Sequence, residues 1–377
     1  MCAATADPNE RARRLELIPY GGHPLHPSAR TRLGWTEEDM RAYDADAPRA
    51  VGLIVARDRD RLLKRWDPER LLEDDQAVFH PWQWEQGARD HFTDTGQRLR
   101  ARPTASVRTL YVPDLGQYVK CSLGITITST RRTVSARTAR LTPLIAERIE
   151  ALALPGHRVL RERASVWHPE HGEHTAIVRA GLPATHERIL PAHVLPAPSP
   201  LTGRPVADDL VAAHGDAEDW WRRYVAAVVP PVLHLAVHHG IALEAHGQNS
   251  LVAFDGAAPA SLWSRDFGGI RLHRPDLPPS MLPDGPSVWD ADLAGLYGHI
   301  SASLVHNHLA PLASALAEHW SIDWWGEVGA LIDTLDLPAS ARDFLFGPVL
   351  PGKALLTAKL KGVGSVYMDF PNPMRRA

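Results

Sequence analysis

The sequence predicts an α+β fold in which antiparallel strands are flanked by helices. Two hairpin patterns favour it. Runs rich in Thr, Ile, Val and Tyr lie near residues 108–132, and short apolar runs lie near residues 251–263, with turn residues between the runs. Stretches with helical periodicity flank both patterns. With 377 residues, the chain is long enough for two to three domains or one large domain with subdomains.

Composition excludes several classes of protein. Hydrophobic residues make up 44% of the chain and charged residues 23%, which is typical of globular proteins rather than fibrous or disordered ones. The net charge is -3, so no overall field favours DNA or RNA, and no nucleic-acid partner is expected. The cysteines, Cys2 and Cys121, are too few for a disulfide framework or a four-cysteine metal site.

The sequence gives no sign of a membrane segment. The first twenty residues lack the apolar core of a secretory signal. The longest apolar stretch, VAAVVPPVLHLAVHHG, is interrupted by Pro230 and Pro231 and carries histidines, so it is too short and too polar to span a bilayer. We therefore expect a cytoplasmic protein without membrane contact.

In chain order, the pattern predicts charged helical structure over 39–73, the first hairpin, and a helix over 137–152. Alternation over 122–128 places Leu123, Ile125 and Ile127 on one face and the hydroxyl residues on the other, with Lys120. A helix or helix pair kinked at Pro230-Pro231 follows over 207–240, then the second hairpin, then helices from residue 290 onward. The expected division is 1–189, a proline-rich connection at 190–205, and 206–377.

Four clusters carry residues suited to chemistry. The first, GGHPLHPSARTRLGW, holds His23, His26, Arg30 and Arg32; its arginines suit carboxylate or phosphate, and the alternative is a structured surface loop. The second, FHPWQWEQ at 79–86, is either a pocket wall or a helix start that packs two tryptophans.

The third cluster joins ASVRTLYV to KCSLGITITSTRR and combines cations with hydroxyls. Such a face suits a triphosphate, because Lys and Arg bind its charge and hydroxyls bind the remaining oxygens. The alternative is an exposed strand face with ordinary charges. No GxxxxGK[ST] and no helix-opening GxGxxG occurs, so neither a P-loop nor a dinucleotide fingerprint is predicted. Its polar members are Ser106, Arg108, Thr109, Lys120, Thr126, Thr128, Ser129, Arg131 and Arg132.

The fourth cluster joins EAHGQNSLV to SRDFGG. Glu244, Asn249 and Asp266 offer oxygen ligands for Mg²⁺, and Gln248 and Asn249 can bind a base or ribose. Alternation along a strand end would put Glu244, His246 and Gln248 on one face. The alternative for each residue is a turn side chain that satisfies local backbone.

In this order, the clusters resemble the NRPS-independent siderophore synthetases of the IucA/IucC family. GHPLHPSARTRLG is similar to the family's GHPxHPxxKxRxG, and HPWQ, SVRT, Lys120 with TSTRR, EAHGQN and RDF are similar to its later motifs. The closing KALLTAKLK with Asn372-Pro373 is similar to its FhuF-like segment. The resemblance covers nearly the whole chain. Arg30 stands where the family has lysine, and the GHP motif opens early, which implies a shortened N-terminal thumb.

The resemblance implies a cupped-hand fold of reduced thumb, fingers and palm. It also implies an ATP- and Mg²⁺-dependent ligase that adenylates a carboxylate, citrate-like or another polycarboxylate, and passes the acyl group to an amine, hydroxylamine or alcohol. The usual assembly would be a homodimer. The implied catalytic residues are Lys120, Arg132 and His246. The implied nucleotide-binding residues are Ser106, Arg108, Thr109, Lys120, Thr128, Ser129, Gln248, Asn249 and Asp266.

The implied substrate-binding residues are His23, His26, Arg30, Arg32, Arg132 and His246, and the implied metal ligands are Glu244, Asn249 and Asp266. Two other functions stay open. One is a compact tailoring ligase that forms an amide or ester in a metabolite other than a siderophore. The other is a non-catalytic siderophore-binding or iron-reducing protein, which the scarcity of cysteines disfavours.

Overall fold

The computed structural model describes residues 6–19, 30–47, 49–128, 130–185, 187–273, 291–363 and 366–375. The chain forms two compact units. Unit 1 comprises Met1–Glu147, Leu160–Ala184 and Ala358–Gly364. Unit 2 comprises Arg148–Val159, Thr185–Thr357 and Ser365–Ala377. The chain therefore passes between the units more than once, whereas the sequence predicted a single crossing at residues 190–205.

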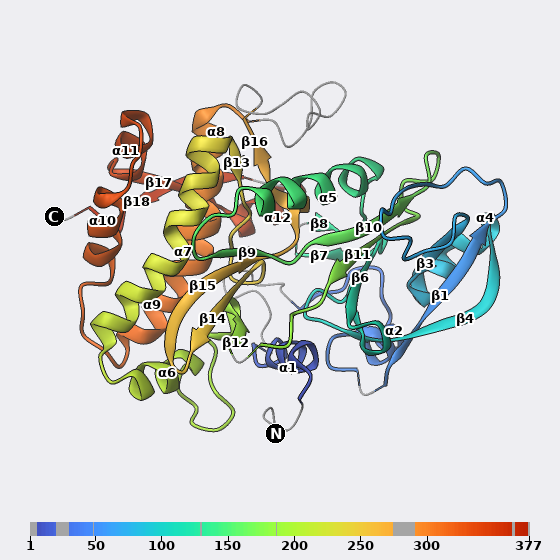
Figure 1. Ribbon diagram of the computed structural model, residues 1–377, viewed down its shortest axis with the longest axis horizontal. Helices are drawn as coiled ribbons and strands as arrows, with labels where there is room; N and C mark the ends of the chain where they lie inside the picture. Colours follow the sequence, from blue (N-terminus) through green and yellow to red (C-terminus); the bar gives the residue numbers. More distant parts are fainter. Residues whose placement is uncertain are drawn as a thin grey trace. The chain divides into compact units, whose positions relative to one another are not determined.

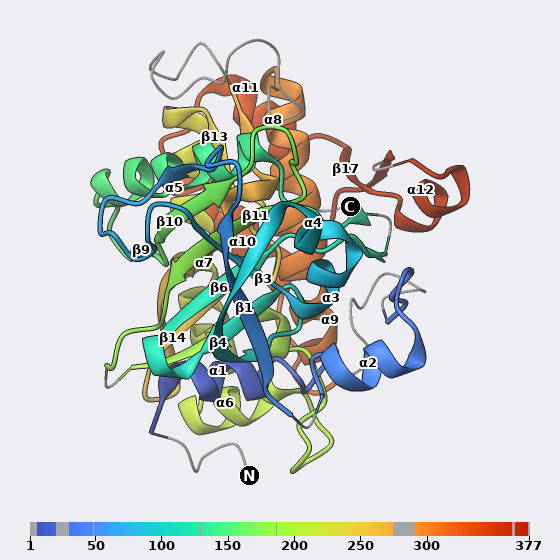
Figure 2. The ribbon, with the colours of Figure 1, turned by 90° about the vertical axis from the view of Figure 1, so that its right-hand side faces the viewer.

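Unit 1 is built on an eight-stranded sheet in the order β2-β10-β11-β6-β5-β4-β1-β3. Every neighbouring pair in it is antiparallel, as predicted for this fold class. Figure 2 looks onto this sheet, with the long strands β1 and β4 in front. The strands are β1 (Val51–Asp58), β2 (Lys64–Trp66), β3 (Gln76–Phe79), β4 (Phe92–Pro103), β5 (Thr109–Val112), β6 (Gln117–Cys121), β10 (Glu162–Trp167) and β11 (Thr175–Ala180).

The first predicted hairpin is confirmed as β5 and β6. The two strands pair with Tyr111 opposite Tyr118, and the short 3-10 turn η3 (Pro113–Leu115) joins them. Gly116 ends this turn with a φ of 62°, a left-handed conformation that glycine adopts without steric cost. The turn therefore fixes the register that sets the polar residues of β5 against those of β6.

The helical pattern predicted over residues 39–73 is wrong beyond α2 (Glu37–Tyr43). The run VGLIVARD forms strand β1, which lies between β4 and β3 and is buried along most of its length. A strand covered on both faces reads as a continuous apolar run, which periodicity cannot distinguish from a buried helix. Part of the charge that suggested a helical surface instead forms cross-strand ion pairs, such as Arg57 with Asp75.

Shorter elements complete unit 1. The helix predicted over 137–152 is confirmed as α5, whose last residues belong to unit 2. The core of the sheet buries large apolar side chains completely, among them Leu53, Phe92 and Leu110. The remaining elements are α1 (Pro8–Leu15), α3 (Pro81–Gln83), η2 (Trp84–Ala88), α4 (Arg89–His91), β7 (Thr126–Ile127), β8 (Thr130–Arg131) and α5 (Ala136–Ala151).

Unit 2 contains a four-stranded sheet in the order β12-β14-β15-β9. The second predicted hairpin is confirmed as β14 and β15, with Gly256 at its turn (φ 59°). Strand β9 is parallel to β15, and the other pairs are antiparallel. The strands are β9 (His157–Val159), β12 (Arg188–Pro191), β14 (Ser250–Asp255) and β15 (Ala258–Ser264).

The proline-rich stretch predicted as a connection lies within unit 2. Its first residues form β12, which pairs with β14, and Val194 and Leu195 are fully buried. Pro191 is tolerated because β12 is an edge strand, where a missing N–H breaks no ladder on the open side. The interpretation of this stretch as a linker is therefore wrong. Prolines indicate where the hydrogen-bond ladder of a sheet ends, but they do not indicate whether the surrounding residues are buried.

The structure contains a helix pair over residues 207–240, as one of the two predicted alternatives. The break lies at Gly215 (φ 91°), between α6 (Val206–His214) and α7 (Ala217–His239), rather than at the two prolines. Helix α7 runs along β14 and β15 (Figure 1). The Trp220 ring stacks on Phe254 at 6.3 Å, and its Nε1 donates to the Ala257 carbonyl at the hairpin turn (3.0 Å).

The helices predicted from residue 290 onward are confirmed, with short strands among them. No helix of the described residues is both long enough and apolar enough to cross a bilayer. The remaining elements of unit 2 are η4 (Ala192–Val194), β13 (Ile241–Ala242), η5 (Phe267–Gly269), β16 (Arg271–Leu272), α8 (Leu293–Ile300), the π-helix η8 (Ser301–Leu309), α9 (Ala310–Ala317), α10 (Trp324–Thr334), α11 (Ala339–Leu345), β17 (Val349–Lys353), α12 (Leu355–Lys361) and β18 (Tyr367–Pro371). The second half of α12 belongs to unit 1.

Candidate active site

The SVRT motif forms a tight turn between β4 and β5 in unit 1. The Ser106 hydroxyl accepts from the Thr109 N–H (3.2 Å), and the Thr104 hydroxyl donates to the Thr109 carbonyl (2.8 Å). Val107, at the centre, is fully buried with a φ of 56°. A β-branched residue adopts this left-handed conformation only at an energetic cost, so the surrounding packing must impose it.

Lys120 lies inside the unit 1 sheet. It sits on β6, opposite Thr109 on β5 and Ile177 on β11, and only 2% of it is exposed. A lysine so fully enclosed is rare, because removing an ammonium from water is costly unless it is paired. The sheet therefore holds this cation in a fixed position next to the SVRT turn.

Alternation over 122–128 is confirmed for its apolar members. Leu123, Ile125 and Ile127 are buried in one cluster. The polar members bind nearby backbone: the Ser122 hydroxyl accepts from a backbone N–H (3.0 Å), and the Thr128 hydroxyl donates to the Ile127 carbonyl (2.5 Å). In this structure, these two hydroxyls support the local fold.

Two cationic side chains lie beside the TSTRR segment, and a third, Arg132, belongs to it. Lys359, from α12, donates to the Thr128 carbonyl (3.1 Å). Arg132 donates to the Ile127 carbonyl (3.3 Å), and Arg108 donates to the Arg132 carbonyl (2.8 Å). Of the predicted cations, Arg108 and Arg132 therefore lie together at this segment, and Lys359 lies beside them although the sequence interpretation did not include this lysine. The KALLTAKLK motif was the signal available for it.

The two predicted substrate arginines of the first cluster are already paired with carboxylates. Arg32 contacts Asp44 at 3.0 Å, with 7% of each side chain exposed, and Arg30 contacts Asp46 at 3.5 Å in an exposed position. The buried ion pair between Arg32 and Asp44 therefore has a structural role. A substrate acid would have to compete with Asp44 for the Arg32 guanidinium. The predicted residues that lie outside the described residues are His23, His26 and Ser129.

The HPWQ motif supports the fold, as its helix-start alternative predicted. His80 caps α3 by accepting from the Trp82 N–H (3.2 Å), and burial lowers the pKa of His80 to about 3, so its ring is neutral. Gln83 accepts from the Gly124 N–H (2.8 Å) and so ties this helix to the segment before β7. The motif therefore positions the TSTRR segment indirectly.

In unit 2, the EAHGQN motif is a loop of turns between β13 and β14. The expectation that Glu244, His246 and Gln248 share one strand face is therefore wrong, because strand alternation does not apply to a turn. Instead, His246 Nδ1 accepts from the backbone N–H groups of Gln248 (3.2 Å) and Asn249 (3.4 Å). A neutral ring whose Nδ1 accepts must carry its proton on Nε2.

Glu244, the acid of this loop, has a strongly lowered pKa. Burial would raise its pKa, but attraction to Lys353, His246 and His299 outweighs this and lowers the pKa to about 2. Lys353 Nζ lies 3.0 Å from one carboxylate oxygen, and His246 Nε2 lies 4.0 Å from the other. A side chain at Gly269 would meet this carboxylate, so the Glu244 side chain would have to move to accommodate it.

The other predicted residues of unit 2 lie around the same loop. The Asn249 side-chain amide donates to the Glu244 carbonyl (3.2 Å), and Asp266 caps η5 with a φ of 64°. The guanidinium of Arg265, which the sequence interpretation did not assign, donates twice to the Gln248 carbonyl (3.0 and 2.8 Å). The loop is therefore held by Asn249 from within it and by Arg265, which follows β15.

The residues assigned to Mg²⁺ do not form a metal centre as described. The Glu244 carboxylate is paired with Lys353, and the Asn249 amide donates to backbone. Within the described ranges, no group of three or more His, Cys, Asp or Glu side chains is arranged to hold a metal ion. The assignment of Glu244, Asn249 and Asp266 to Mg²⁺ therefore stays a prediction.

Backbone strain marks three of the motifs. Six non-glycine residues of the described chain have a positive φ, and three of them belong to SVRT, TSTRR and RDF. Such strain tends to persist at ligand sites, where the surrounding structure over-determines the backbone. The three are Val107, Thr128 and Asp266.

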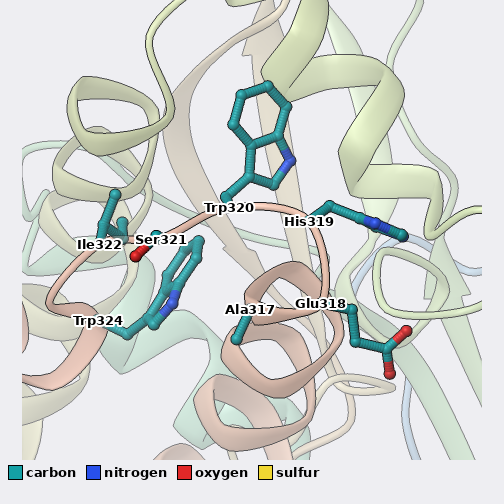
Figure 3. A pocket seen from close by; sticks show the side chains of 7 residues that line it. All are labelled: Ala317, Glu318, His319, Trp320, Ser321, Ile322 and Trp324. Atoms are coloured by element: carbon teal, nitrogen blue, oxygen red, sulfur yellow. The ribbon is translucent and has the colours of Figure 1, made fainter.

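A hollow of about 480 Å³ lies elsewhere in unit 2, after α9 (Figure 3). Trp320 there donates to the buried carboxylate of Asp208 (2.8 Å), which fixes its indole. No residue predicted from the sequence lines it, so we do not assign it to the candidate site. Its lining residues are Ala317, Glu318, His319, Trp320, Ser321, Ile322 and Trp324.

We expect Lys353→Met to lower the free energy of unfolding at pH 7 by about 1–3 kcal/mol, because it leaves Glu244 without its nearest cation. The folded-state pKa of Glu244 lies below the ordinary value, so its contribution is present above pH 4.5 and is lost as pH falls toward 2. Urea unfolding at pH 7, 4 and 3 should show the deficit shrinking as the pH falls below 4.5. Lys361→Met, at an exposed lysine, is the control; equal deficits at all three pH values would contradict the pairing.

Comparison with known proteins shows that the chain is similar to siderophore synthetases. Residues 12–197 match the IucA / IucC family, and residues 218–365 match the ferric iron reductase FhuF-like transporter family. The fold is shared with ATP-bound aerobactin synthetase IucA of Klebsiella pneumoniae (TM-score 0.82, 21% identity, 99% of this chain and 79% of that one).

Two relatives are named as ligases. A citryl-spermidine/3,4-dihydroxybenzoyl-citryl-spermidine:spermidine ligase of Bacillus anthracis is 29% identical over 70% of this chain, which spans 52% of that relative's length. An L-2,3-diaminopropanoate--citrate ligase of Staphylococcus aureus is 25% identical over 94% of this chain and 73% of its own length. Fold and motifs thus define a siderophore-synthetase-like protein. Residues 12–197 of the chain are thus similar to the IucA/IucC family.

Proposed function

We propose that the protein is an ATP-dependent ligase of siderophore biosynthesis. It adenylates a citrate-like or other polycarboxylic acid, releases pyrophosphate, and transfers the acyl group to an amine, hydroxylamine or alcohol. The observation that carries this proposal is the family match combined with a fold shared by an ATP-bound synthetase over 99% of the chain. The named relatives, which are ligases of citrate or its derivatives, support the substrate class.

In this proposal, unit 1 binds the phosphates and the acid. Lys120 supplies a fixed ammonium, and Arg132 supplies a planar fork that suits a carboxylate. Arg108 holds the carbonyl of Arg132, so it orients that segment. The same motifs contain three hydroxyl residues, Ser106, Thr109 and Thr128. To bind ligand oxygens, these hydroxyls would have to give up part of their present hydrogen bonds.

In unit 2, His246 is proposed as the donor to the reacting group. Its Nδ1 is occupied by two backbone N–H groups, which leaves Nε2 as the nitrogen that carries the proton. A donor held in this way stabilises negative charge that develops on a carboxylate or an α-phosphate in the transition state. Gln248, Asn249 and Asp266 are proposed to contact the nucleotide. Mg²⁺ enters only as the ion that accompanies ATP.

The iron-reducing alternative does not suit the residues present. The match of residues 218–365 to FhuF-like proteins suggests it. Iron–sulfur ligation needs several thiolates, whereas the sequence has two cysteines. Burial raises the pKa of Cys121 to about 12, so its thiol stays protonated. We therefore favour the ligase. A cytoplasmic location stays a prediction from the sequence, and a homodimer stays a prediction from the resemblance.

The test is turnover with a panel of carboxylates and amines, followed by separation of the nucleotides. Attack of the acid on the α-phosphate yields AMP and pyrophosphate, whereas a carboxyl-phosphate route yields ADP and phosphate. We expect AMP. ADP as the sole product would remove the adenylation mechanism, and no nucleotide turnover with any pair would contradict the ligase itself.

A second prediction concerns ATP affinity. Lys120→Met keeps most of the buried volume and removes the charge, so it should weaken ATP binding by about 1.5–3 kcal/mol, the value of a charge-assisted contact. Calorimetric titration measures this directly. Lys64→Met, at an exposed lysine on β2, should bind ATP as the unmodified protein does. Unchanged affinity in a folded Lys120→Met protein would show that the phosphate role is wrong.

A further inference from the structure

The loop that carries His246 is fixed on both sides of that residue. Before it, the Ala245 carbonyl lies 3.0 Å from His308 Nδ1. After it, the Gly247 carbonyl accepts from the His193 N–H (3.0 Å), and a side chain at Gly247 would collide with the same backbone. Because both neighbours are held, His246 has little freedom to reorient with the loop.

The direction of the His308 hydrogen bonds can be worked out. Burial lowers the pKa of His308 to about 4, so its ring is neutral at pH 7 and carries one proton. Its Nε2 lies 2.7 Å from the Tyr224 hydroxyl, and burial raises the pKa of Tyr224, which keeps that hydroxyl protonated. Tyr224 therefore donates to Nε2, and His308 Nδ1–H donates to the Ala245 carbonyl.

Tyr224 is itself held by rigid neighbours on α7. Its ring stacks on Trp220 (5.3 Å between centroids, 14° between planes) and on Trp221 (5.8 Å, 7°). Both indoles are fully buried, and Trp221 Nε1 donates to the Trp324 carbonyl (2.8 Å). The hydrogen-bond chain thus begins in a packed aromatic core whose side chains cannot turn without opening a cavity.

His308 lies on η8, a nine-residue π-helix. Such wide turns are rare and often occur at functional sites. Here η8 contacts the loop at two more points: the Ser303 hydroxyl lies 3.3 Å from the Leu243 carbonyl, and the Asn307 carbonyl accepts from the Gly247 N–H (3.2 Å). The π-helical segment therefore contacts the loop on both sides of His246.

We propose that His308 is a positioning residue that orients His246 through the Ala245 carbonyl, and that Tyr224 selects the tautomer of His308 that can do so. This inference rests on the proposed role of His246. It adds a requirement that the motif resemblance does not supply. The loop needs the neutral imidazole of His308 on η8 as a hydrogen-bond donor, and that imidazole in turn needs the hydroxyl of Tyr224 on α7.

The experiment compares His308→Leu, His308→Gln and Tyr224→Phe with His306→Gln as the matched control. His306 lies on the same π-helix, but its ring contacts Phe370 instead of the loop. Two readouts are used on each full-length variant: kcat and KM for pyrophosphate release, and the ¹⁵N imidazole shifts of His246. The shifts report the tautomer and surroundings of that ring without requiring turnover.

We expect His308→Leu to lower kcat by about 10–100-fold with KM for ATP within about twofold, because a misdirected group costs rate rather than ground-state binding. His308→Gln keeps a donor and should recover part of kcat. Tyr224→Phe should fall between them, and the His246 shifts should move in the order of the kcat losses. His306→Gln should change neither readout.

Unchanged kcat and unchanged His246 shifts in a folded His308→Leu or Tyr224→Phe protein would overturn the proposal. So would equal losses in His308→Gln and His308→Leu with unmoved shifts, since that pattern indicates a purely structural residue. If the unmodified protein shows no turnover, the proposed function fails, and the His246 shifts still decide whether His308 positions the loop.

Discussion

His246→Ala should stay folded, bind ATP, and lose about 10²–10³ in kcat. The ring is anchored through Nδ1 by the N–H groups of Gln248 and Asn249, and the protonated Nε2 is the group that the reaction would lose. Removing one preorganised donor to a developing negative charge typically costs this much, while ground-state nucleotide binding depends on other residues.

The measurement combines three readouts: melting temperature, ATP binding by calorimetry, and pyrophosphate release. His238→Ala, at an exposed histidine of α7, is the matched control and should behave as the unmodified protein does. Arg132→Ala is the companion variant, and it should also raise KM for the acid. A destabilised His246→Ala protein with near-normal turnover of its folded fraction would count against this site.

Arg179→Met should cause the largest loss of stability, about 3–5 kcal/mol in the free energy of unfolding. Arg179 and Glu162 face each other on β11 and β10, with a 3.4 Å contact, and 3% and 0% of their side chains are exposed. Arg179 contacts Oε1 of Glu162, and Oε2 has no hydrogen-bond partner among the described residues. Removing the arginine therefore leaves a buried carboxylate without its ion pair.

Urea unfolding of three variants tests this explanation. Arg179→Met with Glu162→Leu should recover most of the loss, because an apolar pair carries no desolvation penalty. Arg163→Ala, at a partly exposed arginine that pairs with Glu69, should cost about 0–1 kcal/mol. If the double variant is as unstable as Arg179→Met alone, the loss comes from packing and not from the charge.

Local signals predicted several elements well. The β5–β6 and β14–β15 hairpins carry turn residues between strand-forming runs, and those residues dictate backbone conformation with little help from distant chain. The helices α5 and α10 were also predictable, because their apolar residues recur with the 3.6-residue period of a helix. Leu123, Ile125 and Ile127 were placed on one face because alternation follows directly from backbone geometry.

The failures have one cause in common. The local pattern predicts a helix where β1 lies and a linker where β12 lies, because burial on two faces or at a sheet edge depends on neighbouring elements and leaves no local period. The loop around His246 was read as a strand end, although its turns are fixed by contacts to η4 and η8 from other parts of the chain. The EAHGQN sequence alone does not indicate these contacts.

The residue types available for chemistry are visible in the sequence: the basic and hydroxyl residues of the SVRT and TSTRR motifs, and the acid, imidazole and amides of EAHGQN. Their order along the chain is enough to suggest the family. Their charge states and orientations follow only from folding. The tertiary structure shows that Lys120 is enclosed, that Lys353 lowers the pKa of Glu244, and that His308 holds the carbonyl next to His246. Protonation and orientation depend on burial and on partners distant in the chain, and these exist only after folding.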